Sequence, residues 1–187
     1  MKRSIVVFDV DKTLIRGDFH VLIGESWTRS ARGRKVLWRA AGLLRFMLGI
    51  GFLRRKFEYL SVEFIDEEFI KSETRRVLDN DELVNRTLLR RLARYQKKGV
   101  EVLLITASPL KTAGALSAAL NTDVASSRMR FGYLIDDLLG EKRRIYRKLE
   151  SENRIIRTIY SDSELDFWGN ARKNVLVLDS GFRWYVR

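Results

Sequence analysis

The sequence predicts an α/β fold built on a mostly parallel sheet. Short apolar runs alternate along the chain with longer segments in which apolar residues recur at helical spacing, which is the pattern of a layered α/β structure. The chain has 187 residues, of which 45% are hydrophobic, so it can bury a substantial core. Residues 16 to about 80 depart from the alternation and have a helical pattern throughout. This predicts a helical insertion after the first strand.

Four segments are expected to form strands of the sheet. They are residues 4–10, 100–106 (VEVLLIT), 154–160 (RIIRTIY) and 174–178 (NVLVL). Short apolar runs bounded by polar residues are typical of buried strands. With the helical insertion set apart, we expect residues 1–15 and 81–187 to form one core domain, into which residues 16–80 are inserted.

Two helices of the core have recognisable boundaries. The first is expected between Asp81 and Lys98, and Gly99 marks its end. Apolar residues recur there at helical spacing, at Leu83, Leu88, Leu89, Leu92 and Tyr95. The second helix is expected in SPLKTAGALSAAL, with Ser108 as its cap and Pro109 at its first helical position.

The rare residue types exclude several kinds of chemistry. The chain has no cysteine, which rules out disulfides, thiolate zinc sites and a cysteine nucleophile, and which permits a reducing compartment. Its single histidine, His20, rules out a metal site built from several histidines and argues against phosphotransfer through histidine. The chemistry must therefore depend mainly on carboxylates, hydroxyls and lysines.

The formal charge of +12 predicts attraction to an anionic partner, which could be nucleic acid, a membrane face or a phosphorylated substrate. No signal-peptide pattern is present at the amino terminus. The most apolar window, residues 36–53, contains Arg39 and Arg45, which would be costly at a bilayer centre. We therefore expect a cytoplasmic protein, with peripheral association at the inner face of the membrane as an open alternative.

Polar side chains follow three of the expected strands. They are Asp9, Asp11 and Thr13 after the first strand, Thr106 at the end of the second, and Asp162 and Asp166 after the third. Ligands bind at the carboxyl ends of strands in open parallel sheets. Carboxylates gathered there would repel one another by roughly 4 kcal/mol per pair at about 4 Å. This arrangement favours Mg²⁺, which prefers oxygen ligands, and we expect Lys142 to add further positive charge.

These residues resemble the motifs of the haloacid dehalogenase superfamily. DVDKT is similar to its first motif, DxDxT, and the LLIT strand ending in Thr106 is similar to its second. Lys142 resembles the third motif and SDSELD the fourth, and the four occur in the right order. The insertion after the first motif is similar to the helical C1-type cap of the phosphoserine phosphatase-like branch. The resemblance implies a Rossmann-like three-layer core with an inserted α-helical cap.

The resemblance also implies a magnesium-dependent phosphomonoester hydrolase that forms an aspartyl phosphate. Asp9 would be the nucleophile and Asp11 the general acid and base, while Thr106 and Lys142 would hold the phosphoryl group. The implied metal ligands are the Asp9 carboxylate, the Asp11 carbonyl, Asp162 and Asp166. The expected substrate-binding residues are Thr13, Asp18 and Ser108.

The substrate is left open by the sequence. Ten basic residues and three acidic ones lie between positions 16 and 60, interleaved with aromatic residues. This segment is typical either of a helix at an anionic membrane surface or of a cap that packs on its own core with a solvated basic face. TLIRGDF and YSDSELD resemble the phosphatidylglycerophosphate phosphatase-like members, which implies a lipid phosphate. The alternative is a phosphoserine phosphatase-like or other soluble small-molecule phosphatase.

Two non-enzymatic interpretations also remain. The chain could be a basic membrane-surface module on the same scaffold. It could also bind nucleic acid, although no nucleic-acid motif is present and such a protein has no need of converging aspartates.

Overall fold

The computed structural model describes residues 3–30, 59–130, 133–178 and 181–186. The strands in these ranges are β1 (Arg3–Asp9), β2 (Glu101–Pro109), β3 (Asp123–Arg130), β4 (Tyr133–Asp136), β5 (Arg154–Ser161), β6 (Lys173–Leu178) and β7 (Gly181–Val186). The helices are α1 (Phe19–Arg29), α4 (Glu67–Asp79), α5 (Arg86–Lys97), α6 (Leu110–Leu120), α7 (Lys142–Ser151) and the short 3-10 helix η1 (Glu164–Asp166).

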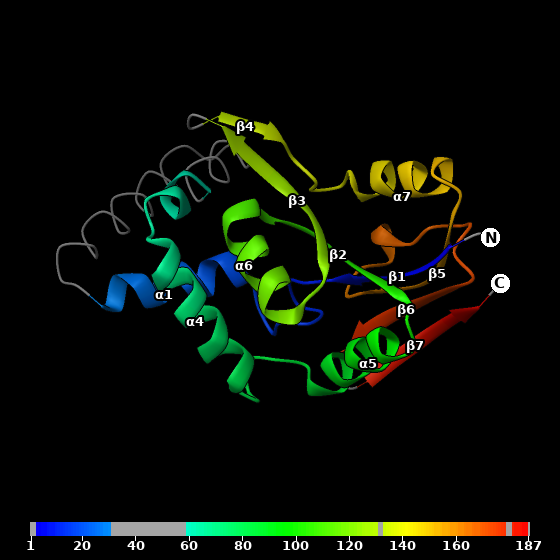
Figure 1. Cartoon of the computed structure of the whole chain (residues 1–187), viewed down its shortest axis with the longest axis horizontal. Helices are drawn as coiled ribbons and strands as arrows, with labels where there is room; N and C mark the ends of the chain where they lie inside the picture. The colour runs from blue at the N-terminus through cyan, green and yellow to red at the C-terminus, as the bar shows by residue number, and fades with distance from the viewer. Residues whose placement is uncertain (1–2, 31–58, 131–132, 179–180, 187) are drawn as a thin grey trace.

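The strands form one sheet in the order β4-β3-β2-β1-β5-β6-β7, with β1 at its centre (Figure 1). The central strands β3, β2, β1, β5 and β6 are parallel, and the edge strands β4 and β7 are antiparallel to their neighbours. The expected mostly parallel α/β fold is thereby confirmed. The four expected strands correspond to β1, β2, β5 and β6, and this order brings the ends of β1, β2 and β5 together.

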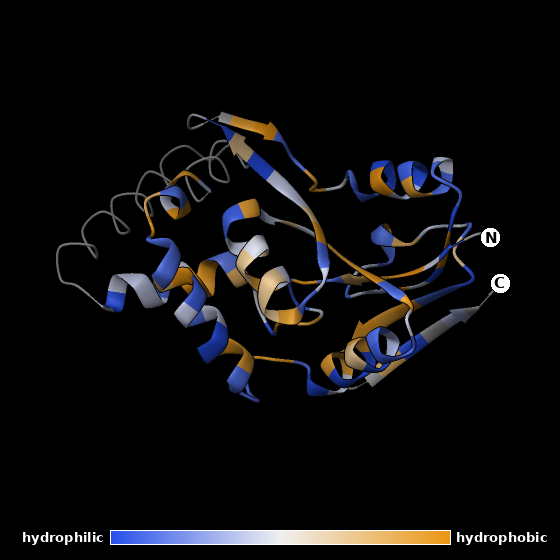
Figure 2. Cartoon of the chain, viewed as in Figure 1, coloured by the Kyte–Doolittle hydropathy of each residue, from blue (hydrophilic) through white to orange (hydrophobic). Residues whose placement is uncertain are grey.

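Both faces of the central strand are buried. Val6 and Phe8 point into a core with α5 and α6, whereas Ile5 and Val7 point into a second core with α7. This division follows from the strand itself, because successive side chains point to opposite faces of a sheet. Figure 2 shows apolar central strands, and polar residues on α4, α5 and α7.

The start of α6 differs from the expectation. Pro109 is not its first helical residue but its N-cap, with the extended ψ of 143°, and the helix begins at Leu110. Ser108 does not cap it either, because the N-cap position is Pro109 and no side chain of the described ranges caps this helix. Instead β2 continues to Pro109, after a shift in its register with β3. The hydroxyl of Ser108 is therefore available to the site at the end of β2.

The segment between β1 and α5 contains α1 and α4, and α4 packs against both α1 and α6. Residues 31–58 lie outside the described ranges, and with them lies most of the basic, aromatic stretch for which a membrane surface was considered. Within the described ranges, no helix has both the length and the apolar character needed to span a bilayer.

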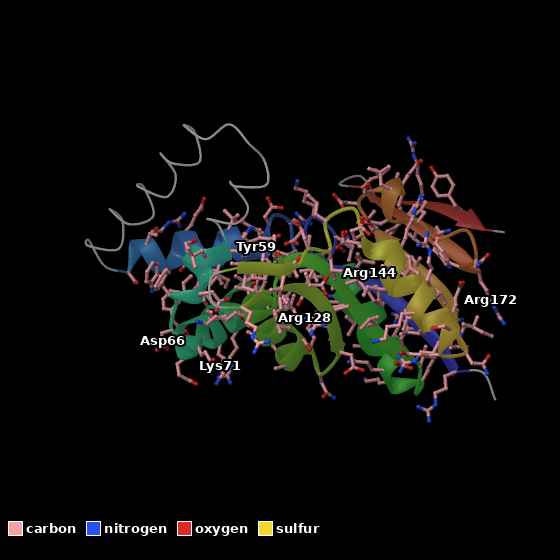
Figure 3. The ribbon with its side chains drawn as sticks, turned by 90° about the horizontal axis from the view of Figure 1, so that it is seen from above. Tyr59, Asp66, Lys71, Arg128, Arg144 and Arg172 are labelled. Atoms are coloured by element: carbon pink, nitrogen blue, oxygen red, sulfur yellow. The ribbon has the colours of Figure 1, made fainter. Side chains whose placement is uncertain are left out.

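Basic residues in the described part are spread along the molecule. Figure 3 shows Lys71 and Arg172 toward its opposite ends, with Arg128 and Arg144 between them. Arg128 and Arg144 are both paired with Asp136, so part of their charge is compensated locally. These labelled cations do not form one continuous basic patch.

The amino terminus of α4 offers a test of stability. The carboxylate of its N-cap, Asp66, accepts hydrogen bonds from the backbone N–H groups of Glu68 (2.8 Å) and Phe69 (3.3 Å). We expect Asp66→Ala to lower the free energy of unfolding by about 1 kcal/mol, measured by denaturant titration, because these N–H groups lose their acceptor. Asp66→Asn keeps an acceptor and should lose much less. Equal losses in the two variants would contradict the capping role.

Candidate active site

Most of the expected site residues line a pocket at the carboxyl ends of β1, β2 and β5; Thr13 and Thr106 are not part of its lining. Its volume is about 430 Å³. The polar side chains that line it are Asp9, Asp11, Lys12, Asp18, His20, Tyr59, Ser108, Lys142, Asp162, Ser163 and Asp166. The pocket therefore combines the ends of three neighbouring strands with the start of α1 and the start of α7.

A buried lysine bridges two of the aspartates. Asp9 is the last residue of β1, and Lys142 is the first residue of α7. The Lys142 ammonium lies 2.7 Å from Oδ1 of Asp9 and 2.6 Å from Oδ2 of Asp166. Because Asp9 and Lys142 are only 6% and 8% exposed, these ion pairs act in a medium that screens them weakly.

The directions of the pKa shifts at Asp9 and Lys142 indicate that one lysine does not balance this cluster. Burial raises the pKa of Asp9 to about 8; Lys142 opposes this rise, and Asp11 and Asp166 add to it. Burial lowers the pKa of Lys142, but the two carboxylates outweigh that effect and the pKa is raised overall. Lys142 is therefore held as a cation, whereas Asp9 needs further positive charge to be a carboxylate at neutral pH.

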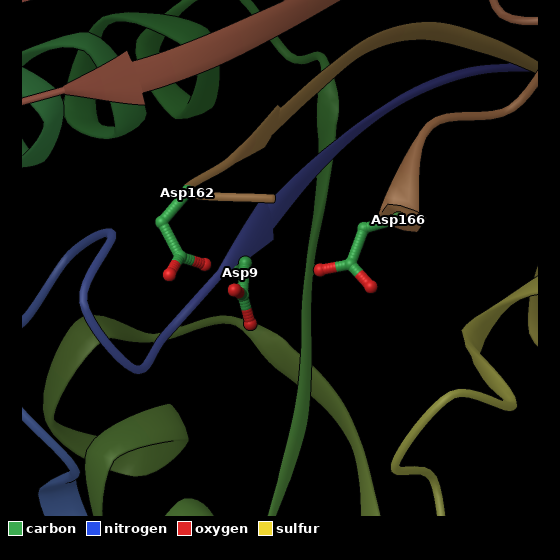
Figure 4. A group of neighbouring side chains, drawn as sticks. All are labelled: Asp9, Asp162 and Asp166. Atoms are coloured by element: carbon green, nitrogen blue, oxygen red, sulfur yellow. The ribbon is translucent and has the colours of Figure 1, made fainter. Parts of the chain in front are cut away.

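The third aspartate of the cluster provides a place for that charge. Asp162 and Asp166 lie on either side of Asp9, and carboxylate oxygens of the three come within 4.8 Å of one another (Figure 4). Lys142 pairs with Asp9 and Asp166, but no cationic side chain of the described ranges pairs with Asp162. A set of carboxylate oxygens suits a hard divalent cation. The arrangement therefore fits a metal ion between Asp9 and Asp162.

Two hydroxyl groups hold this cluster in place. Thr13 donates to Oδ2 of Asp9 (3.3 Å) and accepts from the backbone N–H of Asp162 (3.0 Å). Ser161, the last residue of β5, donates to Oδ2 of Asp166 (2.7 Å). Thr13 is buried, so the structure places this expected substrate-binding residue where it links Asp9 to the backbone at Asp162.

The carboxylate of Asp11 has its own set of hydrogen-bond partners, at the end of β2 and the start of α1. Its Oδ2 accepts a hydrogen bond from Thr106 (2.7 Å), and its Oδ1 accepts one from the backbone N–H of Phe19 (2.7 Å). Ser108 lies 3.1 Å and 2.9 Å from the two oxygens. All four aspartates line the same pocket; Asp9, Asp162 and Asp166 form its tight group, while the Asp11 carboxylate is held by hydrogen bonds at the end of β2. Thr106 contacts Asp11 directly, which the sequence did not indicate.

The start of α1 contributes groups to the same pocket. Asp18 is the N-cap residue of α1, and its carboxylate lies 3.9 Å from the Lys12 ammonium. His20 is buried, and its Nδ1 lies 3.0 Å from Oγ of Ser108. The rings of Tyr59 and His20 pack in a T-shaped arrangement, and the Tyr59 hydroxyl donates to the carbonyl of Ala107. Sequence reasoning missed His20 and Tyr59; the available signal was a lone histidine two residues after Asp18.

The chain matches the family model described as haloacid dehalogenase-like hydrolase over residues 6–167. A search of curated proteins gave no match.

Solved structures resemble the fold. A protein of unknown function from Bordetella pertussis Tohama I is 16% identical, with a TM-score of 0.60 over 89% of this chain and 85% of that one. A phosphoserine phosphohydrolase-like protein from Francisella tularensis SCHU S4 is 17% identical, with a TM-score of 0.57 over 94% and 87%. A phospho-aspartyl intermediate analogue of phosphoserine phosphatase is 13% identical, with a TM-score of 0.53 over 89% and 81%.

Proposed function

Since the chain belongs to the haloacid dehalogenase-like hydrolase family, we propose that it hydrolyses phosphomonoesters through an aspartyl phosphate on Asp9. The observation that carries the proposal is the position of Asp9. Its carboxylate faces the pocket between the Lys142 ammonium and the carboxylate of Asp162. A nucleophile of this kind divides one difficult displacement at phosphorus into two easier ones.

The proposed reaction uses two carboxylates of β1 and the loop after it. Asp9 attacks phosphorus, and the bond from phosphorus to the ester oxygen breaks as Asp11 gives that oxygen a proton. Asp11 then removes a proton from water, which attacks phosphorus and releases Asp9. Lys142 stabilises the charge on the phosphoryl oxygens in both steps. Thr106 supports the reaction by holding the Asp11 carboxylate at 2.7 Å.

The metal proposed for this site is Mg²⁺. The carboxylates of Asp9 and Asp162 and the main-chain carbonyl of Asp11 would hold it, and Asp166 would act as a further ligand or orient the others. When bound, it would supply positive charge to a phosphoryl oxygen. The raised pKa of Asp9 supports this proposal, because a nearby divalent cation favours the carboxylate form that attacks phosphorus.

We propose that residues 16–80 form a cap over the core. In the described part, α1 supports this assignment because it brings Asp18 and His20 to the pocket. Substrate recognition would then be shared between Asp18 and Ser108 at the pocket wall and residues of the remaining cap.

The pocket also has an apolar side, which favours a substrate whose leaving group is partly apolar. Leu139 and Leu165 line the pocket and are 56% and 82% exposed. Exposed leucines beside a phosphate site would gain by covering apolar surface of a ligand. A lipid phosphate such as phosphatidylglycerophosphate, reached at an anionic membrane surface, fits this feature. A soluble phosphomonoester such as phosphoserine is the second candidate.

A panel of phosphomonoesters with and without Mg²⁺ tests the proposal. We expect hydrolysis of several esters with Mg²⁺, and a higher kcat/KM for phosphatidylglycerophosphate in mixed micelles than for phosphoserine. Leu165→Ser should lower kcat/KM for the lipid and leave that for p-nitrophenyl phosphate nearly unchanged, because only the lipid presents a long apolar surface. The opposite order of substrates would favour the soluble ester. No hydrolysis of any ester would contradict the reaction itself.

A further inference from the structure

We infer that His20 is a positioning residue for Asp11 and that it acts through the hydroxyl of Ser108. The inference rests on the proposed function, in which Asp11 is the general acid and base. The chain of contacts runs from Nδ1 of His20 to Oγ of Ser108 (3.0 Å) and from there to the two oxygens of Asp11 (3.1 and 2.9 Å). His20 and Ser108 are both buried, with 8% and 1% exposure.

The number of protons fixes the direction of this chain. A serine hydroxyl has one hydrogen to donate, and Ser108 gives it to the Asp11 carboxylate. While Asp11 is a carboxylate, the contact with His20 must then have the imidazole as donor, so Nδ1 carries a proton and Oγ of Ser108 accepts it. This requirement holds whether the ring is neutral or charged. His20 therefore orients the Ser108 hydroxyl toward Asp11, and hydrogen bonds in series strengthen one another.

Helix α1 reaches Asp11 by two routes. The backbone N–H of Phe19 donates to Oδ1 of Asp11 (2.7 Å), and the next residue, His20, reaches the same carboxylate through Ser108. Ser108 is itself fixed, because its backbone N–H donates to Oγ1 of Thr106 (2.9 Å), which in turn donates to Asp11. The orientation of the proposed acid is thus set jointly by the start of α1 and the end of β2.

A fault in the orientation of an acid has a kinetic signature. Protonation of the departing oxygen matters greatly for an alkyl phosphate, whose alkoxide is a poor leaving group, and little for p-nitrophenyl phosphate, whose phenolate leaves unaided. The constant kcat/KM reports the steps up to the first irreversible one, which here is the phosphorylation of Asp9. The ratio of kcat/KM for glycerol phosphate to that for p-nitrophenyl phosphate therefore measures how well Asp11 is placed.

The variant His20→Phe removes the donor and keeps an aromatic ring beside Tyr59. We expect it to lower the alkyl-to-aryl ratio by about 10-fold or more, within the range that general acid catalysis contributes. His20→Asn places an amide N–H near the former Nδ1 and should restore most of the ratio. Thr28→Val is the matched control, because Thr28 is a buried polar residue of α1 whose hydroxyl donates to the Glu25 carbonyl of the same helix (2.8 Å).

A double-mutant cycle with Ser108→Ala tests the route. If His20 acts through Ser108, then His20→Phe should change the ratio little in the Ser108→Ala background, so the two effects will be far from additive. Additive effects of the two substitutions on the ratio would overturn the inference. An equal loss of kcat/KM on both esters in His20→Phe would also overturn it, because such a loss indicates a structural role only. A similar fall in the alkyl-to-aryl ratio of kcat/KM in Thr28→Val would also overturn the inference. A wild-type protein that hydrolyses neither ester removes the proposed function, and the inference with it.

Discussion

The variant Asp9→Asn is expected to retain less than about 1% of the wild-type kcat, a loss of at least roughly 2.7 kcal/mol in transition-state stabilisation. An amide cannot form the acyl phosphate, so the first chemical step is lost. The side chain keeps its shape and an oxygen that can accept the backbone N–H of Val10, which is 2.8 Å from Oδ1 of Asp9. The fold should therefore survive, as measured by circular dichroism and thermal unfolding.

Controls for this variant separate chemistry from charge. Asp123→Asn makes the same chemical change at an exposed position at the start of β3 and should leave kcat unchanged. Acid quenching of the wild-type reaction, followed by peptide mass spectrometry, should find phosphate on Asp9. More than about 1% residual kcat in Asp9→Asn, with no deamidation of the new asparagine, would contradict its role as nucleophile.

Removal of divalent metal is expected to have an effect of similar size. Excess chelator should reduce kcat by at least about 100-fold, and added Mg²⁺ should restore it. Without the metal, an anionic substrate would meet Asp9, Asp162 and Asp166 with Lys142 as the cation that pairs with this cluster. That repulsion opposes both binding and attack.

The variant Asp162→Ala assigns the metal requirement to a residue. It should raise the Mg²⁺ concentration needed for half-maximal activity, or abolish activity, because it removes a ligand that no cation of the described ranges neutralises. Asp123→Ala should leave that concentration unchanged, since Asp123 lies away from the cluster at the start of β3. Full activity in excess chelator would show that the carboxylate cluster does not need a metal ion.

Much of the central fold could be read from the sequence, because buried strands need continuous apolar residues. The expected strands at 4–10, 100–106, 154–160 and 174–178 agree with β1, β2, β5 and β6. The strands that were missed are those with weak or mixed patterns. In β3, whose sequence is DVASSRMR, only two residues are buried, and β4 and β7 lie at the edges of the sheet. Such strands are held by pairing with a neighbour rather than by a hydrophobic pattern of their own.

The candidate site, like the fold, could be predicted from the sequence only in part. Which carboxylates lie at strand ends was decided by the sequence, since Asp9, Asp162 and Asp166 follow apolar runs whose ends must meet at one edge of a parallel sheet. Where each side chain points depended on partners that are distant in sequence. Asp11 is turned toward Thr106, which lies 95 residues further along the chain. The link from His20 to Ser108 spans 88 residues.

The sequence by itself determined the class of fold, the order of the chemical groups and their gathering at one edge, because local hydrophobic periodicity controls strands and helices and parallel pairing aligns their ends. Only the tertiary structure decided that Lys142 pairs with Asp9 and Asp166, that no cationic side chain of the described ranges pairs with Asp162, and that α1 reaches the proposed acid. These choices depend on hydrogen bonds and ion pairs across the sheet, at distances near 3 Å. No spacing along the chain encodes a contact of that length between separate elements.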